Sequence, residues 1–120
     1  MTTRYERVYS DAEITERLTG DLARWRHADG ALVRVYRTKD WRATLLAAGA
    51  VAHLAEAAWH HPELVLNYPS LEVRLNTHSA SGVTDKDFEL AARIEAVVGW
   101  RPQGGALEGT PENVGYILPD

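Results

Sequence analysis

The strand-forming stretches of this sequence come in closely spaced pairs, and this spacing restricts the possible folds more than any other feature. Residues 24–27 and 31–37 flank Asp29-Gly30, a dipeptide typical of tight β-hairpins. Residues 63–68 and 71–77 flank a second short turn. Because parallel neighbours need a connection of a dozen or more residues, both pairs predict antiparallel hairpins.

Helical segments separate and flank the two hairpins. Residues 10–13 have the S-x-x-E form of a capping box, which predicts a first helix of about ten to twelve residues. Asp40 can cap a second helix over residues 41–59, and Pro62 marks its end. Residues 84–87 open a third helix.

The order of these elements predicts an α+β fold. We expect a two-layer sandwich of α-ββ-α-ββ-α topology, with a four-stranded antiparallel sheet and helices packed on one face. Residues 71–77 alternate apolar and polar side chains, as in a strand with one buried face. The second helix has an apolar stripe that we expect to face the core. That stripe consists of Trp41, Leu45, Ala48, Ala52, Ala55 and Trp59.

The domain organisation changes near the end of the chain. Residues 1–98 are expected to form one domain. Residues 99–120 are rich in glycine and proline and predict an irregular C-terminal extension. Within this extension, residues 114–118 (VGYIL) are expected to dock as a short strand.

Composition excludes several classes of function. The 120 residues include no cysteine, which excludes disulfides, thiolate nucleophiles and iron–sulfur clusters. A formal net charge of −4 argues against direct binding of nucleic acid, which needs a basic face. No apolar run approaches the roughly 20 residues that span a bilayer, and the N-terminus lacks the apolar region of a secretory signal. We therefore expect a cytoplasmic protein without membrane contact.

The second helix also places titratable side chains along one flank, at His53, Glu56 and His60. His60 lies in the last turn, where the helix dipole favours imidazolium, and Glu56 precedes it by one turn. These features are typical of a general acid that works near neutral pH. Solvated surface residues are a second interpretation. A metal site is a third, although H-x-x-E-x-x-x-H lacks the usual spacing of two histidines one helical turn apart.

A longer pattern includes this flank and continues beyond the helix. It comprises Glu56, the His-His-Pro run at 60–62, Tyr68, His78 and Asp87. The residue types and intervals resemble the signature of the pterin-4a-carbinolamine dehydratases, also called 4a-hydroxytetrahydrobiopterin dehydratases. Several separate constraints are met at once, so the resemblance is specific.

The resemblance covers about residues 10–98 and implies the α+β fold already expected, assembled as a homodimer or homotetramer. It implies a hydro-lyase that removes water from 4a-hydroxytetrahydropterin and gives quinonoid dihydropterin, which recycles tetrahydrobiopterin for aromatic amino-acid hydroxylases. The pterin is the substrate. No cofactor and no metal are expected, because the reaction needs only proton transfers.

The resemblance also assigns roles to individual residues. His60 and His78 would form the acid–base pair. His61 would mainly hold the pterin. Glu56 would orient and charge His60, and it is expected to be catalytic together with His60, His61 and His78. Asp87 would support the site, although a plain helix-capping role is equally open. The residues expected to bind substrate are Trp59, His60, His61, Pro62, Asn76, Thr77, His78 and Ser79.

Two positions depart from the family pattern. Ser79 stands where an acidic residue commonly follows Thr-His, and Leu64 stands where an aromatic residue commonly follows His-His-Pro-Glu. These departures and the C-terminal extension keep a second class of function open. In that alternative the chain is a non-enzymatic partner protein that acts in the dimerisation of a transcription factor or in assembly.

Overall fold

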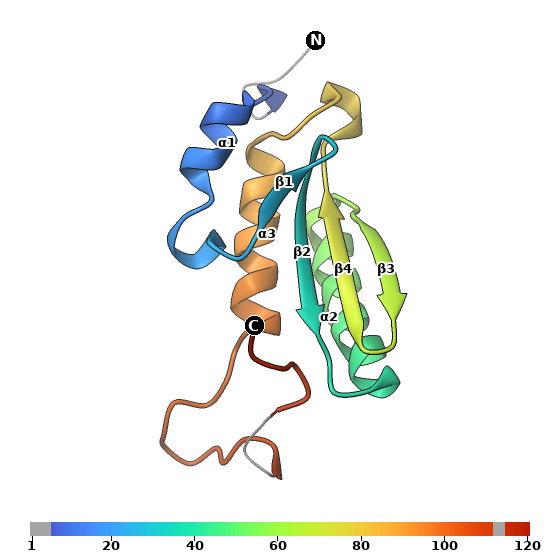
Figure 1. The fold of residues 1–120 in the computed structure, drawn as a ribbon, viewed down its shortest axis with the longest axis vertical. Coiled ribbons are helices and arrows are strands. Elements are labelled where there is room, and N and C mark those ends of the chain that lie inside the picture. The colour runs from blue at the N-terminus through green and yellow to red at the C-terminus, as the bar shows by residue number, and fades with distance from the viewer. Residues whose placement is uncertain (1–5, 112–114) are drawn as a thin grey trace.

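The computed structural model describes residues 6–111 and 115–120. Within these residues, four antiparallel strands form one sheet in the order β1-β2-β4-β3 (Figure 1). Strands adjacent in sequence pair as the two predicted hairpins, and β2 pairs with β4 to join them. The strands are β1 (Arg26–Ala28), β2 (Ala31–Arg37), β3 (Glu63–Asn67) and β4 (Ser70–Leu75).

Helices lie on one face of this sheet and leave the other face open (Figure 1). The predicted α+β class and its two-layer arrangement are therefore confirmed. Helices α2 and α3 also pack against each other, beneath the sheet. The helices are α1 (Asp11–Arg17), α2 (Trp41–Ala58) and α3 (Asp85–Val98), and the 3₁₀ turns are η2 (Gly20–Leu22) and η3 (His78–Ala80).

Each α-helix begins where the sequence supplies a capping side chain. The Ser10 hydroxyl accepts a bond from the Glu13 amide, and the Glu13 carboxylate accepts one from the Ser10 amide, so the capping box is complete. Asp40 Oδ1 accepts from the Ala43 amide at 2.8 Å at the start of α2. Thr84 caps α3 in a second capping box. The predicted starts of all three helices are confirmed.

The predicted lengths are less accurate than the starts. Helix α1 ends at Arg17, well short of ten to twelve residues, and the chain continues through η2, which buries Leu22. Strand β1 begins only at Arg26. The residue before it, Trp25, is buried in the core and its indole N–H donates to Glu95 at 2.9 Å. A tertiary contact therefore replaces the strand that propensity predicts there.

The buried face of α2 differs from the predicted apolar stripe. Trp41 and Leu45 are 46% and 47% exposed, and Trp59 is 75% exposed. Small side chains face the sheet instead, since they let the helix axis approach the strands closely. The prediction is confirmed for Ala48 and Ala55 and wrong for the rest of the stripe, because α2 is apolar around most of its circumference and hydrophobicity does not select one face. The buried residues of α2 are Ala43, Thr44, Ala47, Ala48, Val51 and Ala55.

The core lies between the inner face of the sheet and the helices. Strand β4 alternates as predicted, with Leu71, Val73 and Leu75 fully buried. Phe88 and Ile94 on α3 belong to the same hydrophobic cluster. This packing holds the start of α3 against the end of β4, where the candidate site lies.

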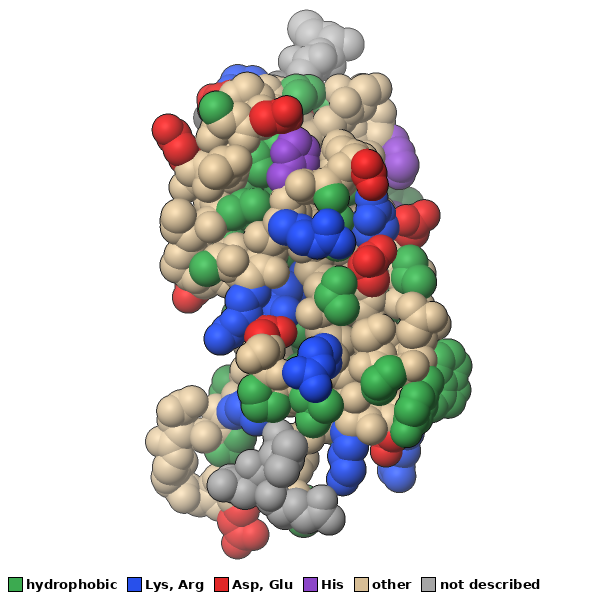
Figure 2. All heavy atoms as spheres, viewed as in Figure 1, with side chains coloured by type: hydrophobic (Ala, Val, Ile, Leu, Met, Phe, Trp, Pro, Cys, Tyr) green, Lys and Arg blue, Asp and Glu red, His purple; other side chains and the backbone are tan. Residues whose placement is uncertain are grey.

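Charged side chains of both signs lie beside one another on the open face of the sheet (Figure 2). Arg74 on β4 lies within 4 Å of the carboxylates of Glu63, Glu72 and Asp29. Exposed pairs of this kind contribute about 0–1 kcal/mol each. They neutralise one another locally, so this face has no single sign of charge.

The C-terminal extension docks beside the far end of β2. The Leu118 amide donates to the Arg37 carbonyl at 2.8 Å, and Ile117 forms an isolated antiparallel bridge with Thr38. The strand predicted over residues 114–118 therefore contributes one bridge, and the first residue of that range lies outside the described residues.

We predict that Leu75→Ala lowers the free energy of unfolding by about 2–5 kcal/mol, because it removes a fully buried side chain and leaves a cavity. Chemical denaturation measures this change. Leu107→Ala is the matched control, since Leu107 is 64% exposed in the extension. Equal losses in the two variants would contradict the assignment of the core.

Candidate active site

The ends of three elements meet at one end of the molecule: the last turn of α2, the exit of β4 into η3, and the first turn of α3 (Figure 1). The described part of the chain brings there His60 and His61 after α2, Thr77 and His78 after β4, and Asp87 on α3. Sequence separations of up to about 30 residues are thus closed by the fold.

Helix α2 ends in a left-handed turn at Trp59, with φ 54° and ψ 47°. A bulky residue in this region is uncommon and marks a position that the surrounding structure enforces. The His60 amide still donates to the Ala55 carbonyl at 3.0 Å, which closes the helix end. After this turn the next two side chains diverge: the His60 side chain is 15% exposed, and that of His61 is 51% exposed.

His60 is bound to a buried carboxylate. Its Nε2 lies 2.7 Å from Asp87 Oδ1, and Asp87 is 0% exposed. The other oxygen, Asp87 Oδ2, accepts hydrogen bonds from Thr77 Oγ1 at 2.8 Å and from the Thr84 amide at 2.9 Å. Both carboxylate oxygens are therefore occupied, which is the condition for keeping a buried charge.

This arrangement determines which nitrogen of His60 can exchange a proton with a ligand. A carboxylate only accepts hydrogen bonds, so Nε2 carries the hydrogen toward Asp87. Nδ1 is then the atom left for proton transfer.

Glu56 does not contact His60. Its Oε1 lies 2.8 Å from Nε2 of His61, and both side chains are largely exposed. The expectation that Glu56 orients His60 fails because the left-handed turn at Trp59 interrupts the helical spacing on which it depended. The carboxylate that orients His60 is Asp87, for which helix capping and site support were both open. In the structure, Asp87 Oδ1 contacts His60 and Oδ2 accepts the capping bond from the Thr84 amide.

His78 is exposed and opens η3 directly after Thr77, which is buried. Thr77 Oγ1 donates to Asp87, so the backbone next to His78 is connected to the carboxylate that binds His60. The fold therefore brings the segments that carry the two predicted acid–base residues to the same buried carboxylate, that of Asp87.

The other predicted binding residues directly precede or follow these histidines and Thr77 in the sequence. The Trp59 ring makes an edge contact with the His61 ring, with centroids 4.9 Å apart. Pro62 and Asn76 are half-buried, and Ser79 is exposed. Sequence reasoning missed the part of Thr84 in binding Asp87, although the Thr-x-x-Asp capping pattern was visible.

Two negative findings concern the described residues. No three histidine, aspartate or glutamate side chains among them lie close enough to hold a metal ion. No helix in residues 6–111 and 115–120 has the length and apolar character that crossing a membrane requires.

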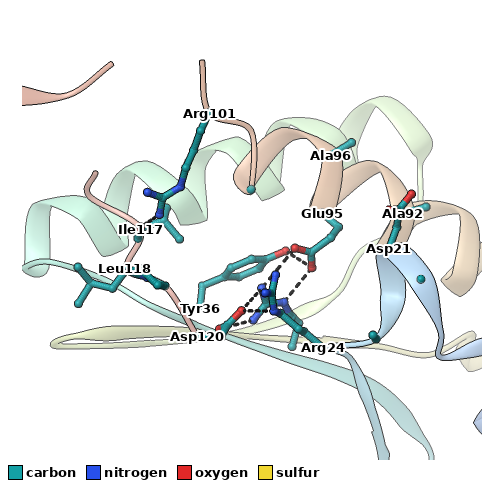
Figure 3. A pocket seen from close by; sticks show the side chains of 15 residues that line it. Asp21, Arg24, Tyr36, Ala92, Glu95, Ala96, Arg101, Ile117, Leu118 and Asp120 are labelled. Carbon is teal, nitrogen blue, oxygen red and sulfur yellow. Dashed lines mark hydrogen bonds and ion pairs between the residues drawn. The ribbon is translucent and has the colours of Figure 1, made fainter. Parts of the chain in front are cut away.

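A hollow of about 720 Å³ lies between η2, α3 and the C-terminal extension (Figure 3). Its buried Arg34 donates to Glu95 at 2.8 Å and to Asp120 at 2.9 Å. Burial opposes the charge of Arg34, but the bonds to these carboxylates outweigh burial and raise the pKa of the guanidinium. Burial and the charge of Glu95 also raise the pKa of Tyr36. These groups bind one another and dock the extension, so we locate the chemistry at the histidines.

The structure defines an α+β protein in which a histidine contacts a buried aspartate, and comparisons identify its family. The family model described as pterin 4 alpha carbinolamine dehydratase matches residues 7–97. The chain therefore belongs to the pterin-4-alpha-carbinolamine dehydratase family, as the sequence pattern predicted.

Individual relatives agree with this assignment. Two proteins named "Putative pterin-4-alpha-carbinolamine dehydratase" are similar to the chain. The one from Aquifex aeolicus is 36% identical over 77% of this chain and 92% of its own length. The one from Haloarcula marismortui is 41% identical over 73% of this chain and 92% of its own length. A crystal structure from Brucella melitensis, titled transcriptional coactivator/pterin dehydratase, matches with a TM-score of 0.70 and 32% identity, covering 78% of this chain and all of that one.

We predict that Asp87→Asn reverses the tautomer of His60. The Thr84 N–H can only donate and therefore requires the amide oxygen, which leaves the amide NH₂, a donor, facing Nε2. Imidazole ¹⁵N NMR should show the hydrogen moving from Nε2 to Nδ1. The free energy of unfolding should fall by about 1–3 kcal/mol, since a buried hydrogen-bonded anion is replaced.

Glu56→Gln is the control, because it alters the exposed pair with His61 and should leave the His60 signals unchanged. A His60 that keeps its hydrogen on Nε2 in Asp87→Asn would refute the proposed orientation.

Proposed function

We propose that this protein is a dehydratase that removes water from 4a-hydroxytetrahydropterin and gives quinonoid dihydropterin. The observation that supports this most directly is the 2.7 Å contact between His60 Nε2 and fully buried Asp87, next to the Thr77-His78 segment. This contact orients the His60 ring, and the bond from Thr77 to the same carboxylate brings the segment of a second, exposed histidine, His78, to the site. Family membership supports the substrate class.

In this mechanism His60 acts as the general acid and His78 as the base. Nδ1 of protonated His60 donates a proton to the 4a-hydroxyl, so the C4a–O bond breaks and water leaves. His78 removes the proton from N5, and the electron pair of that N–H bond forms the C4a–N5 double bond. Each step transfers one proton, which is work that imidazoles perform near neutral pH. Neither a metal nor a further cofactor takes part.

Exposed residues around the pair are assigned to substrate binding. We infer that His61 and Trp59 contact the pterin ring, and that Glu56 acts through its bond to His61. Asn76, Thr77, Ser79 and Pro62 complete the rim. Residues 1–98 form the catalytic domain in this proposal, acting in the cytoplasm, in pterin recycling and without direct nucleic-acid binding.

A second candidate function is supported by the outward face of α2. Trp41, Leu45 and Leu46 are each about half exposed there. A cluster of large apolar side chains on the surface is typical of a site that binds another protein. This face fits a homodimer or homotetramer, or a heterologous protein partner in a non-enzymatic family member. The Brucella melitensis structure, titled in part a transcriptional coactivator, supports keeping this candidate.

We predict that the protein accelerates water loss from synthetic 4a-hydroxytetrahydropterin, followed by ultraviolet absorbance. His60→Ala and His78→Ala should each lower kcat by about 10²–10⁴-fold, the usual contribution of a general acid or base. His53→Ala is the matched control, because His53 is exposed on the same helix and outside the site. It should keep the wild-type rate.

Wild-type protein that leaves the spontaneous rate unchanged would refute the dehydratase and favour the partner-protein candidate. Full activity in His78→Ala would refute the assignment of the base alone.

A further inference from the structure

The segment that precedes α1 lies along the loop that follows His78. The Tyr9 amide donates to the Val83 carbonyl at 2.9 Å. A Cβ at Gly82 would come within 2.7 Å of Val8 Cγ1, so the Val8 side chain would have to shift to accommodate any other residue there. The segment is therefore packed against the loop at two residues, Val8 and Tyr9.

Glu6 makes a third contact at the same place. Its Oε1 accepts hydrogen bonds from Ser79 Oγ and from Lys86 Nζ, both at 2.9 Å. The Glu6 side chain is only 17% exposed. The hydrogen bonds from Lys86 and Ser79 lower the pKa of the Glu6 carboxyl, so it is ionised at neutral pH. We call Glu6, Ser79 and Lys86 the Glu6 bridge.

Each partner of Glu6 is adjacent in sequence to a residue of the candidate site. Ser79 directly follows His78, and Lys86 directly precedes Asp87, which binds His60. One oxygen atom therefore connects the backbone of the proposed base to the helix turn that positions the proposed acid. Glu6 also lies just outside residues 7–97, the part matched by the family model.

We propose that Glu6 is a positioning residue that sets the placement of His78 relative to His60. It acts through Ser79 and Lys86 and does not touch the reacting atoms. Its catalytic consequence rests on the proposed dehydratase function, whereas its effect on the loop does not. Apart from the bridge, the turn 78–81 is held by local backbone bonds. The Thr77 amide donates to the Gly82 carbonyl at 2.8 Å, and the Ser81 amide donates to the His78 carbonyl at 3.1 Å.

The test compares Glu6→Ala, Glu6→Gln and Glu13→Ala in the full chain. Glu13 is the matched control, because its carboxylate bonds to Ser10 and Arg7 in the same N-terminal region and does not reach the loop. Amide hydrogen exchange at Ser81 and Gly82 reports the loop, and amides of the β2–β4 ladder serve as the internal reference.

Glu6→Ala should raise the exchange rates of the Ser81 and Gly82 amides roughly tenfold, as expected for loss of local protection, with the ladder unchanged. Its kcat should fall about tenfold with a smaller change in KM, because misplacing a catalytic group lowers turnover more than binding. Glu6→Gln should keep most of the protection and most of kcat, since an amide oxygen can accept both bonds. Glu13→Ala should match wild type in both.

Wild-type exchange at Ser81 and Gly82 in Glu6→Ala would overturn the proposal, whatever the activity. So would an equal increase in Glu13→Ala, because the effect would then be general loosening. Faster exchange in Glu6→Ala together with an inactive wild-type protein supports the bridge as a loop-positioning element and contradicts the proposed reaction. The two proposals can therefore fail separately.

Discussion

The arrangement of the site depends on one buried anion, the carboxylate of Asp87. A charge without solvent contact persists in a protein only when hydrogen bonds replace its hydration. Here His60, Thr77 and the Thr84 amide supply those bonds. They come from the chain after α2, the exit of β4 and the N-cap of α3, so satisfying this anion requires all three segments to be in place.

Asp87 therefore connects folding to chemistry. The same carboxylate completes the capping box of α3 and orients the imidazole of His60. One oxygen caps the first turn of α3 and the other contacts His60, so the two roles share the position of a single side chain. Loss of order at this helix start would remove the orientation of His60 together with the cap.

Much of the fold could be predicted from local patterns, and the failures have physical causes. Hairpin spacing and capping side chains are local signals, and they correctly predicted the topology and the helix starts. The buried face of α2 was predicted only in part, because alanine and large apolar residues alternate around that helix, and contact with the sheet decides between them.

At the candidate site, a spaced pattern pointed to His60, His78 and Asp87, and the structure places His60 on Asp87. The pairing of the side chains was not predictable: the turn at Trp59 has no sequence signal, and it redirects Glu56 to His61. The proposed role of Glu6 depends on its hydrogen bond with Ser79, which is more than 70 residues away in the sequence, and no local pattern reveals such a contact.

The left-handed turn at Trp59 has a consequence for how this sequence can change. Two adjacent, chemically identical side chains follow it, and a single backbone conformation assigns one to the buried anion and the other to solvent. Inserting one residue directly after Trp59 would place the new side chain at the buried anion and move His60 to the exposed position, although both histidines would be kept. Length in this short connection is thus constrained more tightly than residue identity, and a variant that preserves every histidine can still lose the asymmetry between them.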